Sequence, residues 1–187
     1  MIDYSSLWNS LNRHFLNCLV IIVSITLCLL ILPTRLPGME LLGIGPNWML
    51  IWVVAWSVKR PAEQGAIAGI AVGLLQDAMT IPDPTHAISL GIVGYLTGKL
   101  QKHRYVQEDF ISIALIVFGM AILSETIRAI QFYIIAQRPA DEIWNYHQRI
   151  ALSSAILSSL WAPVVCYPLN RWWEKMKFIN SKAKYKK

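Results

Sequence analysis

Residues 15–32 read FLNCLVIIVSITLCLLIL, a run of eighteen residues without a charge that ends at Pro33. A hydrocarbon core about 30 Å thick is crossed by about 20 helical residues, so this run is long enough to span a membrane. It is longer than the apolar core of a signal peptide, about 7 to 15 residues, and it lacks an A-x-A-like cleavage site. The stretch therefore predicts a retained transmembrane helix.

Five further apolar segments follow, at about residues 41–58, 62–81, 86–100, 110–131 and 150–169, with no soluble domain or internal repeat between them. The chain is 55% hydrophobic and only 15% charged, against about 25% charged residues in soluble domains. Lipid offers no partner to unpaired backbone groups, which favours helices, and the alternating pattern of a membrane barrel is absent. We predict an all-α integral membrane protein, with residues 1–187 forming a single membrane domain built as a bundle of six transmembrane helices.

The basic residues predict the orientation of these helices, because Lys and Arg accumulate on the cytoplasmic side of membrane proteins. With the N-terminus inside, thirteen of the seventeen basic residues fall in cytoplasmic segments: Arg13, Lys59, Arg60, Lys99, Lys102, Arg104, Arg171, Lys175, Lys177, Lys182, Lys184, Lys186 and Lys187. The outer segments hold the other four, Arg35, Arg128, Arg138 and Arg149. Both termini are therefore predicted in the cytoplasm, and this sorting requires the short helix at 86–100.

Residues 170–187 form a basic cytoplasmic tail with six lysines from Lys175 onward. A lysine close to an anionic leaflet is worth about 1 kcal/mol, so anionic lipid is the expected partner of this tail. An acidic cytoplasmic protein is the alternative. The remaining basic residues are dispersed over loops and do not line one groove, so the net charge of +6 does not predict nucleic-acid binding.

Glycines recur every fourth residue on two neighbouring segments. Gly65, Gly69 and Gly73 lie in segment 62–81, and Gly94 and Gly98 lie in segment 86–100. This spacing puts the glycines on one face of a helix and lets two backbones approach closely. Packing between helices of one chain is the commoner meaning of such a pattern. A surface that receives a helix from a partner protein is the alternative.

Four ionisable residues are expected in the outer part of the membrane, and we name them the outer polar cluster: Asp77, His86, Glu125 and Arg128. Ionisable groups inside a bilayer are expensive and normally pair with each other. One interpretation is a clasp in which Arg128 pairs with Glu125 or Asp77 and holds the helices in place. The functional alternative is a binding pocket or proton-linked site that opens to the outside.

Three tryptophans form a ridge along segment 41–58. Trp48, Trp52 and Trp56 recur every fourth residue, and the ridge crosses the middle of the membrane. Interfacial belts of aromatic residues explain Trp172 and Trp173 but not this ridge. Lipid contact or core packing is the commoner explanation, and a docking face for another membrane protein is the alternative.

No residue pattern indicates catalysis, a metal or a cofactor. The sequence contains no G-x-S-x-G, no H-E-x-x-H and no Gly-rich phosphate loop. Cys18, Cys28 and Cys166 all lie in predicted spans without C-x-x-C spacing, which argues against a disulfide framework and a metal site. We therefore predict a protein that is not an enzyme and carries no cofactor.

The stretch GAIAGIAVGLLQD at 65–77, with HAISL at 86–90 and GYLTG at 94–98, resembles the family of the rod shape-determining protein MreD. The segment WSVKRP at 56–61 is similar to that family as well. The outer turn departs from the family pattern, because Pro84-Thr85 stands where a Leu-Gly is expected. The specific motif covers about 35 residues, while size, helix count and basic inner loops agree along the whole chain.

The resemblance implies a non-enzymatic scaffold of the bacterial cell-elongation machinery, located in the inner membrane. Members of the family work with MreC, a membrane-anchored periplasmic protein. Through that complex they work with MreB filaments, RodA and its transpeptidase in peptidoglycan synthesis. The resemblance also implies a bundle similar to the S-component fold, and it implies that Gly65, Gly69, Gly73 and Asp77 shape an outer-facing partner site.

A second candidate is a substrate-binding membrane subunit of an energy-coupling-factor vitamin transporter, which is also a small six-helix bundle. Such subunits commonly dock their partner through an Ala-x-x-x-Ala-type face near the first helix. Residues 15–32 contain no alanine, which disfavours this candidate. A membrane-embedded hydrolase or transferase has the least support.

Overall fold

A computed structural model of the 187-residue chain describes residues 4–34, 39–80, 84–101, 110–136 and 140–185. These residues form six helices: α1 (Tyr4–Ile31), α2 (Trp48–Ser57), α3 (Ala62–Met79), α4 (His86–Gln101), α5 (Phe110–Ala136) and α6 (Ala140–Tyr185). The described part of the chain contains no strand, only one isolated bridge between Leu41 and Ile44. The predicted all-α class is confirmed for these residues.

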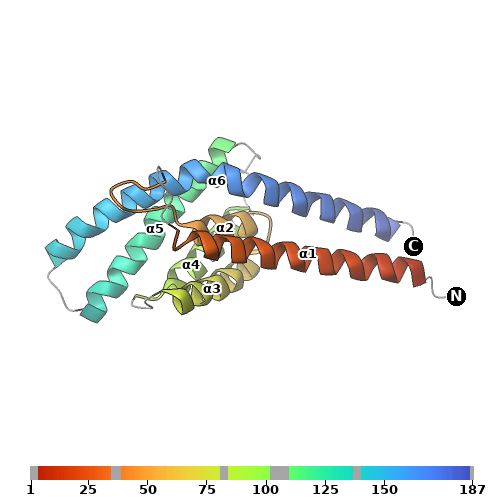
Figure 1. The fold of residues 1–187 in the computed structure, drawn as a ribbon, viewed down its shortest axis with the longest axis horizontal. Coiled ribbons are helices and arrows are strands. Elements are labelled where there is room, and N and C mark those ends of the chain that lie inside the picture. Colours follow the sequence, from red (N-terminus) through yellow and green to blue (C-terminus); the bar gives the residue numbers. More distant parts are fainter. Residues whose placement is uncertain (1–3, 35–38, 81–83, 102–109, 137–139, 186–187) are drawn as a thin grey trace.

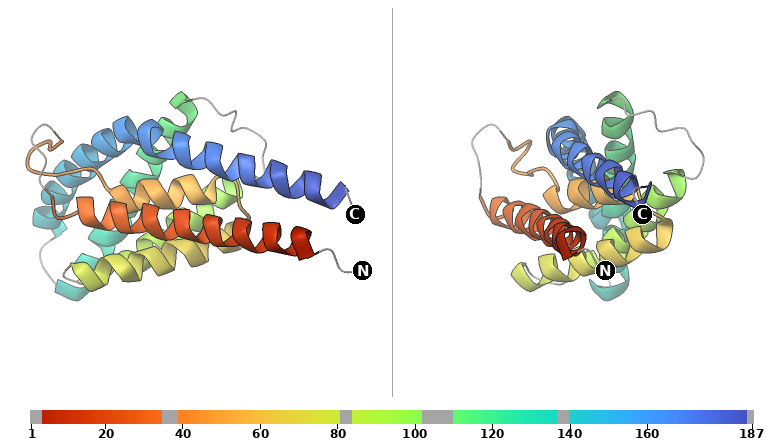
Figure 2. Two further views of the ribbon diagram at one scale, coloured as in Figure 1. Left: turned by 45° about the vertical axis from the view of Figure 1, so that its right-hand side comes forward. Right: turned by 90° about the vertical axis from the view of Figure 1, so that its right-hand side faces the viewer.

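Helix α2 lies at the centre of the bundle and contacts each of the other five helices. Residues 48–55 are all buried. A helix that is apolar on every side, as this one is, has to be covered on every side. Helix α3 packs mainly against α4, and α5 packs mainly against α6, so each of these pairs forms a helical hairpin. The two hairpins and α1 surround α2 (Figures 1 and 2).

Helix α2 is shorter than the predicted span at 41–58, because a tight turn precedes it. Leu41 and Ile44 exchange two backbone hydrogen bonds of 2.9 and 3.0 Å. Leu42 and Gly43 between them have φ values of 56° and 77°. Two central residues with positive φ form a type I′ turn, a conformation that cannot continue into an α-helix.

The start of α2 is set by Asn47, whose side chain accepts a hydrogen bond from the Leu50 N–H at 3.1 Å. The backbone N–H of Asn47 donates to the Ser158 hydroxyl on α6 at 2.9 Å. Ten helical residues span about 15 Å, half of a hydrocarbon core. Membrane crossing by segment 41–58 stays a prediction.

Helix α6 is longer than the predicted span at 150–169, and it continues through the predicted tail as far as Tyr185. Its 46 residues correspond to about 69 Å, more than twice the hydrocarbon core. Pro163 and Pro168 lie inside the helix, and its axis bends (Figure 1), as prolines cause. The tail side chains beyond Met176 lie outside the described residues.

The start of α1 and the end of α6 project from the same end of the bundle (Figures 1 and 2). Apolar side chains cover much of the outside, including Ile111 at 80% exposure and Leu160 at 69%. Two stretches, Phe110–Ile135 and His147–Met176, are long and apolar enough to cross a membrane, and Phe15–Ile31 and Trp48–Ser57 are shorter apolar helices. Helices α3 and α4 are in neither group, and their small and polar residues lower their hydropathy.

Candidate functional site

The α3–α4 hairpin is held together by its glycines. Gly65, Gly69 and Gly73 on α3 face α4, and Gly94 and Gly98 on α4 face α3. A Cβ added at any of the five would lie under 3.0 Å from backbone atoms of the facing helix, a separation that real Cβ atoms essentially never show. The structure thus places all five glycines inside one interface between two helices of the chain.

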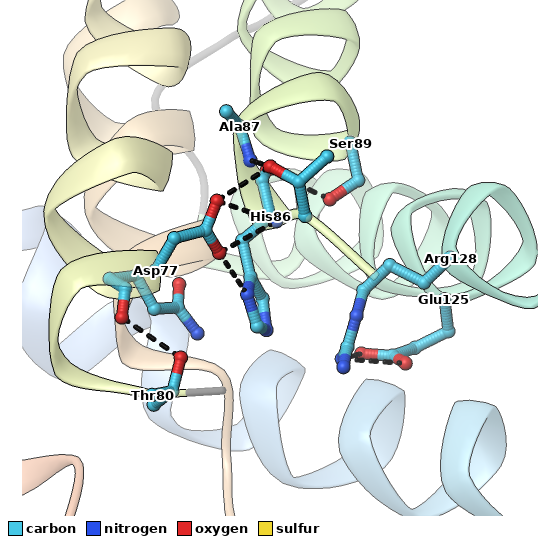
Figure 3. Close-up of polar contacts among 9 residues, drawn as sticks. Asp77, Thr80, His86, Ala87, Ser89, Glu125 and Arg128 are labelled. Carbon is cyan, nitrogen blue, oxygen red and sulfur yellow. Dashed lines mark hydrogen bonds and ion pairs between the residues drawn. The ribbon is translucent and has the colours of Figure 1, made fainter. Parts of the chain in front are cut away.

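Asp77 ties the end of α3 to the first turn of α4 (Figure 3). Its carboxylate accepts a hydrogen bond from the backbone N–H of His86 at 2.9 Å, and the same oxygen lies 2.6 Å from Nδ1 of the His86 ring. A carboxylate at a helix N-terminus satisfies a free N–H group and is stabilised by the helix dipole. Asp77 therefore caps α4 from the neighbouring helix.

Thr85 completes this contact, and no motif singled it out in the sequence. Its hydroxyl donates to the second carboxylate oxygen of Asp77 at 2.6 Å and accepts from the Ala87 N–H at 3.2 Å. The available signal was its position directly before α4, where threonine is a preferred N-cap. Thr85 is also part of the departure from the family pattern. Pro82 and Asp83 of the same turn lie outside the described residues.

Glu125 and Arg128 form an ion pair within α5. Nη1 of Arg128 lies 3.3 and 3.4 Å from the two carboxylate oxygens of Glu125. Glu125 is buried, while Arg128 is partly exposed. The sequence left open whether Glu125 or Asp77 pairs with Arg128, and the structure pairs it with Glu125. The Nε atom of Arg128 has no partner within the described part of the chain.

His86 lies between the two pairs. Figure 3 shows its ring between Asp77 on one side and Glu125 with Arg128 on the other. The four residues predicted from three different segments therefore lie near one another, at the end of α3, the start of α4 and within α5.

A second polar contact links α5 to α6 and was not predicted. The buried His147 ring has Nε2 at 3.4 Å from the Thr126 hydroxyl, and its centroid lies 5.8 Å from that of the Trp144 ring. A single histidine in a predicted outer loop carries no distinctive sequence signal. Its role becomes visible only because α6 begins at Ala140 and brings residue 147 against α5.

The predicted tryptophan ridge lies against other helices of the chain. Trp48 lies 5.7 Å from Trp161, and Trp52 stacks on Trp56 at 5.5 Å, measured between ring centroids. The Trp52 Nε1–H donates to the Ser24 hydroxyl on α1 at 2.9 Å. Trp48 and Trp52 are buried and Trp56 is partly buried. These contacts support the core-packing explanation of the ridge.

The outer polar cluster consists of two polar pairs. Asp77 is hydrogen-bonded to His86, and Glu125 forms an ion pair with Arg128. Within the part of the chain that is described, no group of three or more His, Cys, Asp or Glu side chains could hold a metal ion. The Asp77 contacts join the end of α3 to the start of α4, while the pair of Glu125 and Arg128 lies within α5.

Comparison with known proteins gives one match. The family model described as rod shape-determining protein MreD matches residues 11–168, a region that includes the glycine interface and the whole outer polar cluster. No curated protein and no solved structure matches the chain.

Proposed function

The chain belongs to the MreD family of rod shape-determining membrane proteins of bacteria, and we propose that it is a scaffold without catalytic activity that binds MreC in the rod complex. Through MreC it connects to MreB filaments and to RodA and its transpeptidase, and so supports peptidoglycan synthesis. The observation that carries this proposal is the match of the family model over residues 11–168 of 187. The vitamin-transporter alternative has no comparable support.

The partner site proposed for MreC is the end of the α3–α4 hairpin that carries the outer polar cluster. Two features support this choice. The glycine interface lets α3 and α4 pack closely, since an added Cβ would clash with the backbone of the facing helix. Asp77 then holds the first turn of α4 in place. A hairpin end that is held in this way is a surface to which a periplasmic protein can bind with little ordering cost.

We propose that the six helices cross the inner membrane six times, with both termini in the cytoplasm and a bundle similar to the S-component fold. Two observations support this topology. Thirteen of seventeen basic residues fall on one side of the six-span arrangement. The start of α1 and the end of α6 lie at the same end of the bundle, as an even number of crossings requires (Figure 1).

Site-specific photocrosslinking in native membranes tests the partner site. A photoreactive residue replaces Met79, which is 55% exposed at the end of α3, and in a matched variant it replaces Ile111, which is 80% exposed at the opposite end of the bundle. We expect a crosslink to MreC from position 79 and little from position 111. Equal capture from both positions would contradict the assigned surface. Capture of only a transport ATPase with its coupling subunit would contradict the scaffold function.

A further inference from the structure

The turn between α2 and α3 contains a second charged site, at the opposite end of the bundle from the outer polar cluster. The guanidinium carbon of Arg60 lies 3.4 Å from the centroid of the Trp56 ring and 5.9 Å from that of Trp173. Trp173 lies edge-on to Trp56, with ring centroids 5.0 Å apart. A hydrogen bond of 3.1 Å from the Arg60 N–H to the Ser57 carbonyl holds the backbone of the turn. The side chain is therefore positioned by a cage of two indole rings.

The Arg60 side chain has no acidic partner in the part of the chain that the structure describes. The neighbouring Lys59, by contrast, pairs with Glu174 of α6. Burial lowers the pKa of the Arg60 guanidinium, which means that its surroundings destabilise the positive charge. A buried donor without an acceptor costs free energy, so the site favours an acceptor-rich anion.

Helix α3 adds further donors directly after Arg60. Its N-cap is Pro61, which makes no side-chain capping hydrogen bond. The first N–H of the helix with a backbone partner is that of Gly65, which donates to the Pro61 carbonyl at 3.1 Å. The N–H groups of residues 62–64 thus have no carbonyl partner within the helix. The positive end of the helix dipole lies at the same place.

We propose that Arg60 and the N-terminus of α3 bind the phosphate of an anionic membrane lipid. A guanidinium stacked on an aromatic ring keeps its edge donors available for phosphate, which a lysine does not. The inference rests on the proposed topology, which puts this turn at the cytoplasmic interface, where basic sites between helices bind lipid head groups.

Two observations favour a lipid over an acidic protein as the source of the anion. The cage consists of tryptophans, which prefer the membrane interface. The α3 residues beyond the turn expose apolar side chains along the path of an acyl chain, with Ile67 at 68% exposure and Leu74 at 58%.

The test measures lipid retention by the full-length protein in nanodiscs of phosphatidylcholine containing a minor fraction of phosphatidylglycerol, read by native mass spectrometry. Arg60→Gln should weaken phosphatidylglycerol retention roughly tenfold, as expected for a lost charged hydrogen bond. Arg60→Lys should weaken it less, because it keeps the charge but loses the planar stack. Glu63→Gln, which removes an acidic group from the first turn of α3, should strengthen retention. This expected gain keeps the test valid if Arg60→Gln folds poorly.

Arg171→Gln is the matched control, because Arg171 is also at this end of the bundle but donates to the Tyr167 hydroxyl at 2.5 Å. Its retention of phosphatidylglycerol should remain close to that of the unaltered chain. Equal losses of phosphatidylglycerol retention in Arg60→Gln and Arg171→Gln would overturn the proposed site. Displacement of phosphatidylglycerol by soluble glycerol phosphate or by an acidic peptide, each at the concentration of the lipid, would overturn it as well. Such a result would leave the scaffold function untouched, since crosslinking to MreC from position 79 is measured separately.

Discussion

Asp77 joins α3 to α4 through one carboxylate. It accepts from the His86 backbone, contacts the His86 ring and accepts from Thr85. Asp77→Asn keeps the shape of the side chain but removes the charge, and charge-assisted hydrogen bonds are worth about 1.5–3 kcal/mol. We expect the free energy of unfolding in detergent to fall by about that amount. Thermal or denaturant unfolding of the purified variant measures it.

The control for Asp77→Asn uses two threonines. Thr85→Val removes the hydroxyl that donates to Asp77 and should destabilise the protein by about 1 kcal/mol. Thr34→Val removes an exposed hydroxyl that contacts only the Ile31 carbonyl, and it should have almost no effect. Equal effects of the two changes would show that the Asp77 contact contributes little.

The pair of Glu125 and Arg128 is tested by a double-mutant cycle. Glu125→Gln and Arg128→Gln should each lower the free energy of unfolding, because each leaves a partner charge unpaired. The double mutant should cost less than the sum of the single mutants, with a coupling of about 0.5–3 kcal/mol. Strict additivity in the same unfolding assay would show that the two side chains do not stabilise each other.

At the scale of elements, α3 and α4 can pack closely only because the residues that face each other are glycines, which have no side chain. Gly69→Ala would place a Cβ against the Leu90 carbonyl oxygen and the backbone of α4, and overpacking of this kind costs about 1–3 kcal/mol. Gly119→Ala is the matched control, since nothing lies within 4 Å of a Cβ at that position on α5. It should be neutral or stabilising by about 0.5–1 kcal/mol, as for alanine in place of glycine in a helix.

Both glycine variants are measured by thermal unfolding and by MreC capture from position 79. Gly69→Ala should reduce both stability and capture, because it separates α3 from α4 and shifts the polar end of the hairpin. If Gly69→Ala were as stable as Gly119→Ala, the close contact of the two backbones would not be a constraint on the bundle.

At the scale of the whole molecule, the proposed topology places the turn before α2 outside the cell membrane and the end of α6 inside. Single cysteines at Leu42, which is 77% exposed, and at Lys175 in a cysteine-free chain report the two sides. A membrane-impermeant maleimide should label position 42 in intact spheroplasts and position 175 only after permeabilisation. Labelling of position 175 without permeabilisation would contradict cytoplasmic termini.

Several features of the fold follow from local sequence. The all-α class comes from apolar stretches such as 15–32, and the glycine interface comes from a four-residue spacing that puts Gly65, Gly69 and Gly73 on one face. The first and last residues of α2 and α6 were harder to predict from the sequence. The left-handed conformation at Leu42 delays the start of α2, and a leucine at this position does not predict it.

The sequence by itself determined the helix class and the positions of the polar residues along their helices, because both depend on the order of residues along one segment. It placed Asp77, His86, Glu125 and Arg128 at one level of the bundle. The tertiary structure decided which of them pair, that the tryptophan ridge is covered, and that Arg60 lies between two indole rings. Those outcomes depend on the rotation and packing of helices from distant segments, which hydropathy and spacing along one segment do not specify.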